Sequence, residues 1–507
     1  MKRKIFMVVY DIDVNKGGIN SVMFSRTHLF NNDSYSSDIV TLDDKLNYPE
    51  IVSELHDDGR LNEQSSIINI YDFYRNKFTS GGINEDIVAH YNKNMQKEEP
   101  GYHFYFDGTS ARYFDNGRYV KYKRWTEDGK LSVVDYFSDM RVRETREEYH
   151  PDGYLLRKMT YHPADNNVNQ EHYFTKEGFC YLSRWFNHVT GKQQRVVLFS
   201  PDKQNARVFS TNLEFHSYFL DELCSTEDTK PVVICDGPGS SAKVQRMKKE
   251  SASKIYTIHR NHLQEPFTLG SKLKADDELV LMNEDREAPI VVLTNRQKID
   301  IEAQFPEMKW NIHVISHAMP IETVEVEKKD NLIVVVSRLS KAKRLNLLIE
   351  AFKKTSEEVP DAKLHIYGSG VEKAALLAQI KELKLTKKVR LIGYTTEPKV
   401  KLAQALFTVN TSAYEGQSLT CLEAFSMKTA ALSFKINYLV REMYQEGVTG
   451  ALVENNNVDE LAAYMTDWLY NPEKVKQYGE QAYNIIRENY TLDKQYNEWH
   501  HLIQTLQ

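Results

Sequence analysis

The chain has 507 residues, of which 41% are hydrophobic and 27% are charged, and its formal net charge is −6. One hydrophobic core stops growing at about 250–300 residues, so the length predicts two or three soluble globular domains. The acidic balance argues against bulk electrostatic binding of nucleic acid. The four scattered cysteines form neither a zinc motif nor a disulfide framework.

Targeting signals are equally sparse. The N-terminus is basic, but the apolar run Ile5–Tyr10 is too short for the core of a signal peptide. No stretch approaches the ~20 apolar residues of a membrane span. Together with cysteines typical of a reducing compartment, these features predict a cytoplasmic protein that meets a membrane-bound acceptor only peripherally.

The first region, residues 1–80, has the strand and helix pattern of an α/β domain. A buried-type strand at Ile5–Tyr10 is followed by a glycine-containing loop, a helical pattern at Ile19–Leu29 and a strand at Ser37–Thr41. This order is the opening of a doubly wound, Rossmann-like sheet. The same pattern returns at 206–325, which we interpret as the second part of the same domain.

Residues 81–205 interrupt that domain and have a different pattern. Turn signals such as Asp107-Gly108 and Asn116-Gly117 recur at intervals of mostly about 9–13 residues, which predicts an antiparallel β-meander. Residues 101–200 hold 21 of the 57 aromatic residues, together with 15 Lys/Arg and 13 Asp/Glu. We expect most aromatics to pack the sheet, and this near-neutral surface to serve self-association or polymer binding, with a homotrimer as the expected assembly.

A charged linker at Glu322–Asp330 leads into a third region, residues 326–507. It opens with the apolar strand Leu332–Ser337, alternates helices with strands, and ends in amphipathic helices. This predicts a second doubly wound domain. Two such domains place the carboxyl ends of their parallel strands on either side of a cleft, where ligands of these folds bind.

The strongest chemical signal is the segment Tyr414–Ala424, which carries Glu415 and Glu423 across a strand-to-helix turn. A helix N-terminus facing a cleft offers free N–H groups to an anion. Carboxylates beside it can accept hydrogen bonds from sugar and ribose hydroxyls. Two glutamates at this spacing are also common on solvated helices, and only the buried-type residues around them favour a site.

Two further segments fit a bound diphosphate. Arg338 and Lys343 lie on a loop after the first strand of the third region, where the two cations suit phosphate oxygens. Gly17 and Gly18 follow the first strand of the chain and would allow close backbone approach to a phosphate. The alternatives are a solvated basic loop and a tight turn, and neither a G-x-G-x-x-G nor a Walker pattern is present.

Together these residues resemble the retaining glycosyltransferases of family four, which have the GT-B fold. The segments Asp13–Gly18, Asp236–Gly239, His365–Gly368, Gly393–Thr396 and Tyr414–Gln417 also look like the teichoic acid α-glycosyltransferases of Gram-positive bacteria. Those enzymes carry a β-rich insertion in the first domain. The expected fold is therefore α/β GT-B, with two Rossmann-like domains facing a cleft and an antiparallel insertion in the N-terminal one.

The resemblance implies a role for each matching residue. Arg338 and Lys343 would bind the donor diphosphate and stabilise it as it leaves, and Glu415 would contact the transferred sugar. His259 would lie near the sugar and the acceptor, although a lone histidine after a strand is more often structural. The remaining donor-binding candidates are Gly17, Gly18, Tyr394 (beside the uracil), Gly416, Leu419 and Glu423 (on the ribose).

Two segments depart from the related enzymes. The chain reads Lys435–Leu439 where a Gly-Pro turn is usual, and His317–Met319 where an Asn-Gly turn is frequent. Neither departure removes a catalytic group. We expect both to affect acceptor details and domain closure.

The implied reaction is transfer of glucose or N-acetylglucosamine from its UDP-sugar to a poly(polyol phosphate), in α linkage and without metal or other cofactor. Arg260, Lys341 and Arg344 are candidates for a cationic acceptor groove. A protein acceptor (a serine-rich adhesin), a small sugar or lipid acceptor, and a non-catalytic glycan-binding adaptor remain as alternatives. The intact Glu415, Glu423, Arg338 and Lys343 argue against the adaptor.

Overall fold

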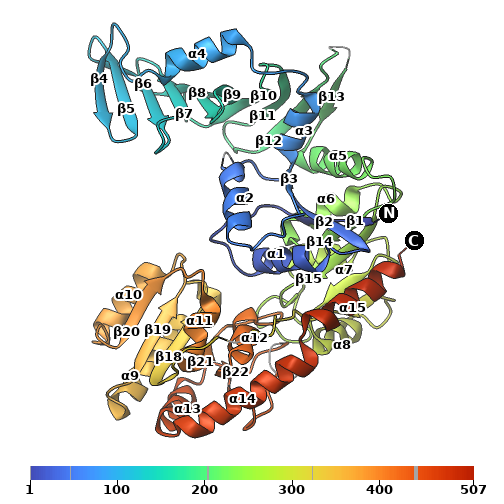
Figure 1. The fold of residues 1–507 in the computed structure, drawn as a ribbon, viewed down its shortest axis with the longest axis vertical. Coiled ribbons are helices and arrows are strands. Elements are labelled where there is room, and N and C mark those ends of the chain that lie inside the picture. Colours follow the sequence, from blue (N-terminus) through green and yellow to red (C-terminus); the bar gives the residue numbers. More distant parts are fainter. Residues whose placement is uncertain (1, 46, 203–204, 323, 439–442, 507) are drawn as a thin grey trace.

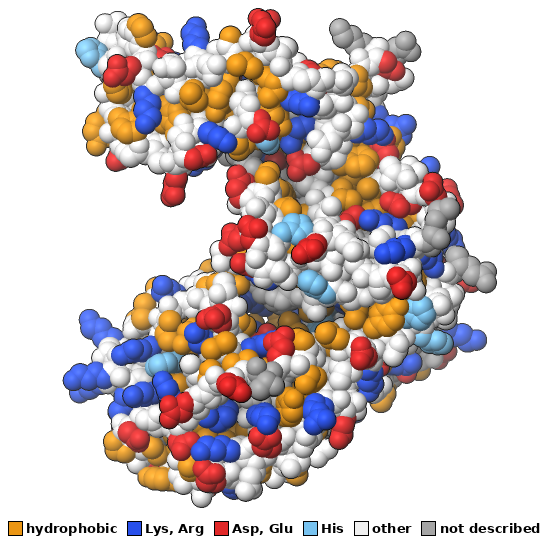
Figure 2. Space-filling view, in the orientation of Figure 1, with side chains coloured by type: hydrophobic (Ala, Val, Ile, Leu, Met, Phe, Trp, Pro, Cys, Tyr) orange, Lys and Arg blue, Asp and Glu red, His pale blue; other side chains and the backbone are white. Residues whose placement is uncertain are grey.

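The structure is a computed structural model, and it describes residues 2–45, 47–202, 205–322, 324–438 and 443–506. Three bodies follow one another in a C-shaped arrangement (Figure 1). The antiparallel insertion lies at the top, the N-terminal Rossmann-like domain in the middle and the C-terminal one at the bottom. Figure 2 shows a hollow on one side of the molecule, between the insertion and the C-terminal domain.

The N-terminal domain is built on a parallel sheet with the strand order β17-β16-β15-β14-β1-β2-β3. Its central strands are apolar because helices cover both faces, which leaves no side for polar residues. The prediction that this domain resumes after an insertion is confirmed by the direct pairing of β1 with β14. The strands are β1 (Arg3–Val9), β2 (Tyr35–Thr41), β3 (Ile67–Asn69), β14 (Val232–Cys235), β15 (Ser253–Ile258), β16 (Ile290–Val292) and β17 (Ile312–Val314).

Several helices of this domain begin at side-chain caps. Asn69, Thr211 and Thr294 each accept a hydrogen bond from a backbone N–H of the first turn. Helix α1 instead begins after Gly18, which has a positive φ of 66°. The helices are α1 (Ile19–Leu29), α2 (Tyr48–Asp57), α3 (Ile70–Phe78), α5 (Asn212–Cys224), α6 (Ser241–Arg246), α7 (Ala275–Leu281) and α8 (Asn295–Gln304).

The insertion is an antiparallel meander in which β4 to β13 pair in sequence order, as the recurring turns predicted. Helix α4 (Glu85–Met95) packs on it through Tyr91, beside Trp125 and Tyr149. At the free end of the sheet every residue of β4 is exposed. The strands are β4 (His103–Asp107), β5 (Ser110–Asp115), β6 (Arg118–Trp125), β7 (Leu131–Phe137), β8 (Arg143–His150), β9 (Tyr154–Tyr161), β10 (Val168–Phe174), β11 (Cys180–Phe186), β12 (Gln193–Phe199) and β13 (Ala206–Phe209).

The C-terminal domain has a second parallel sheet, with the order β20-β19-β18-β21-β22-β23. Its strands are β18 (Lys329–Val336), β19 (Lys363–Tyr367), β20 (Val389–Gly393), β21 (Ala405–Asn410), β22 (Ala430–Phe434) and β23 (Gly450–Val453). Its helices are α9 (Leu345–Glu358), α10 (Lys373–Glu382), α11 (Pro398–Ala403), α12 (Leu419–Ser426), α13 (Val458–Tyr470) and α14 (Pro472–Asn489).

The last helix, α15 (Leu492–Gln504), crosses back to the N-terminal domain (Figure 1). Trp499, Leu502 and Ile503 are buried in the core formed by β1, β2 and α1. Residues 326–507 therefore comprise the second Rossmann-like domain and one helix that packs on the first. Across the described segments, no helix combines the length and the apolar character needed to cross a membrane.

Candidate functional site

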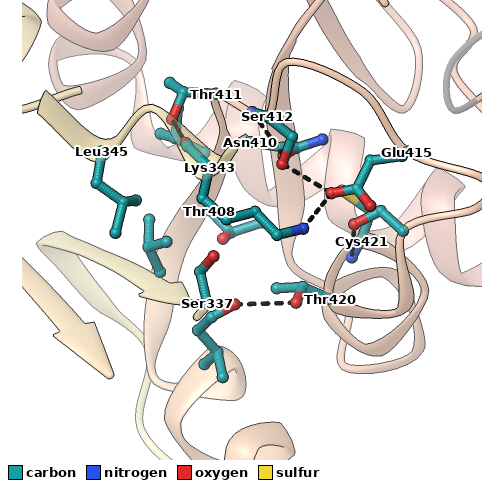
Figure 3. A pocket seen from close by; sticks show the side chains of 14 residues that line it. Ser337, Lys343, Leu345, Thr408, Asn410, Thr411, Ser412, Glu415, Thr420 and Cys421 are labelled. Atoms are coloured by element: carbon teal, nitrogen blue, oxygen red, sulfur yellow. Dashed lines mark hydrogen bonds and ion pairs between the residues drawn. The ribbon is translucent and has the colours of Figure 1, made fainter. Parts of the chain in front are cut away.

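The centre of the candidate site is an ion pair at the carboxyl ends of two neighbouring strands. Lys343 ends a short 3-10 turn after β18, and Glu415 lies on the loop between β21 and α12. The Lys343 Nζ lies 2.5 Å from Glu415 Oε1, and the Ser412 hydroxyl donates to the same oxygen at 2.7 Å (Figure 3). The structure thus brings together two of the predicted catalytic residues.

Arg344 holds this arrangement in place. Its backbone is left-handed (φ 46°, ψ 39°), and its guanidinium donates to the carbonyl oxygens of Thr411, at 2.8 Å, and Ser412. In return the Thr411 hydroxyl donates to the Lys343 carbonyl at 2.8 Å. These bonds join the loop after β18 to the loop after β21, so Arg344 positions both members of the ion pair.

Arg338 differs from Lys343 in being exposed, and no ion pair joins its guanidinium to any residue that the structure describes. Its loop is shaped by two glycines that the sequence analysis did not assign to the site. A Cβ on Gly368 would lie 1.8 Å from the Ser337 carbonyl oxygen, and one on Gly370 would lie 2.3 Å from that of Leu339. Only glycine therefore lets the loop after β19 pack against the backbone on either side of Arg338.

Helix α12 begins beside the ion pair. Its N-cap Ser418 accepts a hydrogen bond from the Cys421 N–H at 3.3 Å, and Leu419 is its first residue. Glu423 lies one turn further along and is partly buried. Burial raises the pKa of its carboxyl to about 7, against the opposing charge of Lys399. No described residue donates to the Glu423 carboxyl a hydrogen bond that would favour its ionised form.

The N-terminal domain contributes a buried group of hydrogen-bonded titratable side chains. The Arg26 guanidinium donates to Asp236 Oδ1 at 2.6 Å, and His259 Nε2 lies 2.8 Å from the same oxygen. Burial alone would raise the pKa of Asp236, but Arg26 and His259 hold it below its ordinary value. Burial also lowers the pKa of His259, although Asp236 opposes that effect. His259 is thus a neutral imidazole whose Nε2–H donates to a carboxylate.

That tautomer leaves the Nδ1 of His259 as a hydrogen-bond acceptor. This nitrogen is buried and has no hydrogen-bond partner among the described residues. An imidazole oriented by a buried carboxylate is a common arrangement for accepting a proton or hydrogen bond from a hydroxyl. Asp236 is therefore a positioning residue to which sequence reasoning gave no role in the site, because Arg26, Asp236 and His259 are far apart in the chain.

The two domains touch where these groups face each other. A Cβ on Gly416 would lie 2.3 Å from the His259 carbonyl oxygen, so the two backbones are in close contact. Next to this contact, the Gln417 side chain accepts a hydrogen bond from the His317 N–H at 2.7 Å. The His317 ring lies parallel to that of His259, with 5.5 Å between centroids. His317, from the first segment that departs from the related enzymes, thus helps to bring the Glu415 loop and His259 to the same region.

The glycine loop of the N-terminal domain also lies next to the C-terminal domain. Gly17 and Gly18 have no close neighbour that would prevent a ligand's approach, since the nearest atom to a Cβ on Gly17 is the Ser21 hydroxyl at 4.0 Å. The Tyr394 hydroxyl donates to the Val14 carbonyl at 3.4 Å, which links the loop after β20 to this loop. The second departure, Lys435–Leu439, also contacts the N-terminal domain, through Asn437 and the Phe267 carbonyl; Leu439 lies outside the described residues.

The expected cationic groove is altered by existing contacts. Arg344 is committed to backbone carbonyls, and burial lowers its pKa to about 10. Arg260 pairs with Asp277 at 2.9 Å and with Asp276 at 3.4 Å. Two of the three cations proposed for the groove therefore serve other partners, and only Lys341 keeps its role as a candidate.

Comparison with known proteins agrees with this geometry. The family described as "Glycosyl transferases group 1" matches residues 321–485, which include Arg338, Lys343, Glu415 and Glu423. The poly(ribitol-phosphate) alpha-N-acetylglucosaminyltransferase of Staphylococcus aureus is 30% identical over 508 residues, covering 98% of this chain and 99% of that protein. The chain belongs to the group 1 glycosyltransferases.

Two further matches extend the comparison. The poly(glycerol-phosphate) alpha-glucosyltransferase of Bacillus subtilis is 24% identical over 96% of this chain and 72% of its own length. A crystal structure of an S. aureus TarM mutant, in complex with fondaparinux, alpha-GlcNAc-glycerol and UDP, superposes with a TM-score of 0.88 at 29% identity, covering 99% of both chains. The predicted family, the GT-B fold with its inserted meander and the hexosyltransferase class are thereby confirmed.

Proposed function

We propose that this glycosyltransferase moves glucose or N-acetylglucosamine from a UDP-sugar onto a poly(polyol phosphate), with retention and in α linkage. The observation that carries the proposal is the Lys343–Glu415 pair, in which Lys343 shares a loop with the exposed Arg338 and Glu415 precedes Gly416, the residue in contact with the His259 backbone. The names of the S. aureus and B. subtilis relatives support the polymer acceptor. UDP and alpha-GlcNAc-glycerol in the TarM complex support the donor and product classes.

Departure of UDP builds negative charge on the diphosphate. Arg338 and Lys343 would stabilise that charge where it develops, and the N-terminus of α12 would add its free N–H groups. Since Lys343 pairs with Glu415, a bound diphosphate would share this cation with the carboxylate. These side chains can supply the stabilisation that a divalent ion supplies elsewhere, and we propose transfer without metal or other cofactor.

The transferred sugar would lie between the two domains. Glu415 would accept hydrogen bonds from its hydroxyls, and Glu423 would accept those of the ribose. The free Nδ1 of His259 would accept from a hydroxyl of the sugar or the acceptor, on the face that UDP leaves. The backbone of Gly17 and Gly18 would approach the donor phosphate. Tyr394 would line the uracil pocket. Gly416 and Leu419 would line the donor site where α12 begins.

We also propose that the insertion mediates self-association, with a trimer as the expected assembly. The edge strand β4 is fully exposed and includes Phe104, Tyr105 and Phe106. Figure 2 shows hydrophobic side chains at this end of the insertion. An uncovered edge strand offers unpaired N–H and C=O groups to another chain. Sedimentation at micromolar concentration tests this: a monomer would refute it.

The acceptor is decided by a matrix of assays. Purified enzyme is incubated with UDP-glucose or UDP-N-acetylglucosamine and with poly(glycerol phosphate), poly(ribitol phosphate) or a serine-rich peptide. We expect transfer to one of the two polymers. In the cell, we propose that the reaction takes place in the cytoplasm, where nucleotide sugars are made. Transfer to the peptide alone would move the assignment to adhesin glycosylation, and donor binding without hydrolysis or transfer would favour an adaptor.

A further inference from the structure

A cluster of two histidines and an aspartate lies on the insertion, on a different sheet from the residues proposed for transfer. His162 and Asp165 belong to the turn between β9 and β10, and His188 belongs to the turn between β11 and β12. The two turns lie at the same end of the sheet. The Asn167 amide donates to the His188 carbonyl at 2.7 Å and so joins one turn to the other.

The three side chains converge on a small volume. One potential ligand atom from each of them lies within 4.8 Å of the other two. His188 Nδ1 is 2.9 Å from Asp165 Oδ2, and His162 Nδ1 is 3.6 Å from Asp165 Oδ1. The two imidazole rings stack with 3.7 Å between centroids and 11° between planes, so one ring must turn out of the stack before a single ion can lie in the plane of both. The side chains of His188 and Asp165 are partly exposed to solvent, so an ion can reach them.

The hydrogen bonds around His162 define which atoms carry lone pairs. The Ala164 N–H donates to His162 Nδ1 at 3.3 Å, and the Asn167 N–H donates to Asp165 Oδ1 at 3.0 Å. Both atoms are therefore acceptors, yet they face each other at 3.6 Å. The single lone pair of His162 Nδ1 accepts from the Ala164 N–H, so an ion bound at this nitrogen must displace that hydrogen bond. In a tetrahedral zinc site with bonds of about 2.0–2.2 Å, neighbouring nitrogen and oxygen ligands are about 3.4 Å apart.

We propose that His162, Asp165 and His188 bind one Zn²⁺, with water completing the coordination. The choice of ion follows from the donor set, because imidazole nitrogens favour zinc-like transition metals, whereas magnesium and calcium prefer all-oxygen ligands. On binding, the ion takes the place of the proton between His188 Nδ1 and Asp165 Oδ2, and the neutral ring carries its one proton on Nε2 instead. The ion fixes the two turns to each other and takes no part in glycosyl transfer.

The test uses the full-length protein after treatment with a chelator and its removal. Isothermal titration with Zn²⁺ is expected to show one saturable site per chain. Asp165→Asn and His188→Ala are expected to weaken binding by about 10–100-fold or more, as loss of a partner at a metal site does. Asp165→Asn keeps the shape of the side chain.

The control is His103→Ala, which removes an exposed histidine from β4 of the same sheet. It is expected to leave zinc affinity unchanged. Circular dichroism checks that each variant is folded, and the Co²⁺ absorption spectrum of the wild type reports imidazole ligation independently. Absence of saturable Zn²⁺ binding by the wild type, or equal affinity in Asp165→Asn and His188→Ala, would overturn the proposal and leave the cluster as a hydrogen-bonded pair of turns.

Discussion

Replacing Glu423 by glutamine should have opposite effects on stability and on donor binding. The folded-state pKa is about 7 and the ordinary value is 4.5. The folded state therefore binds more protons than the unfolded state between these values, and wild-type stability falls as pH rises from 4.5 to 7. The difference of 2.5 units corresponds to about 3 kcal/mol, an upper limit because the carboxyl keeps some contact with water.

The glutamine variant has no carboxyl at this position, so its stability does not fall with pH for this reason. Its stability advantage over the wild type should grow by about 2–3 kcal/mol between pH 5 and pH 8. For a domain of about 150–250 residues, that raises the melting temperature of the C-terminal domain by up to about 6–12 °C at pH 8. Scanning calorimetry at the two pH values measures it. Glu382→Gln, which changes an exposed carboxyl on α10 of the same domain, is the control and should change little.

Donor binding should respond in the opposite sense. Ribose hydroxyls donate to the ionised carboxylate, so UDP affinity of the wild type should increase as pH rises through 7. Glu423→Gln should bind UDP about 5–10-fold more weakly at pH 8, since it exchanges a charged acceptor for a neutral one. UDP affinity is measured for both proteins in the same buffers, so protonation of UDP itself affects both affinities equally and drops out of their ratio. A variant that is no more stable at pH 8, or that binds UDP with wild-type affinity and pH dependence, would refute the reasoning.

Four further outcomes are expected. Arg338→Ala and Lys343→Ala should each cost about 2–4 kcal/mol of transition-state stabilisation in kcat/KM, and near-wild-type turnover in both would contradict the diphosphate assignment. Gly416→Ala should lower kcat/KM about 100-fold, since its Cβ would meet the His259 carbonyl at 2.3 Å and push the domains apart; Gly82→Ala, which meets nothing within 4 Å, is the matched control. EDTA should leave transfer intact, and a steep loss restored by Mn²⁺ would count against the proposed mechanism. With a polymer acceptor KM should rise with salt more than with a short acceptor, and equal slopes would argue against a polyanion groove.

Local patterns in the sequence were sufficient to predict the fold. Buried-type strands alternating with amphipathic helices predict both Rossmann-like domains, and evenly spaced turn signals predict the meander between them. Helix α1 has the predicted bounds, Ile19–Leu29. These features depend on residues close together in the chain, where propensity and periodicity are most informative.

The parts of the site that could not be predicted depend on contacts between distant segments. Asp236 gains its importance from Arg26, 210 positions earlier in the chain, and from His259. Gly368 and Gly370 matter because their backbones lie against the loop of Arg338, a relation that no local pattern reveals. Arg344 was interpreted as a groove cation because its charge is visible in the sequence, whereas the carbonyls that it serves are not.

The return of α15 to the N-terminal domain has a mechanical consequence. The chain passes between the two domains twice, and the two passages lie side by side, because the Met319 N–H donates to the Tyr490 carbonyl at 2.8 Å. Such a pair of connections behaves as one narrow hinge. Rotation about this pair of connections would keep the bond between Met319 and Tyr490, whereas sliding of one domain along the other would stretch it. Every cycle of opening and closing should therefore return the Glu415 loop to the same partner, His259.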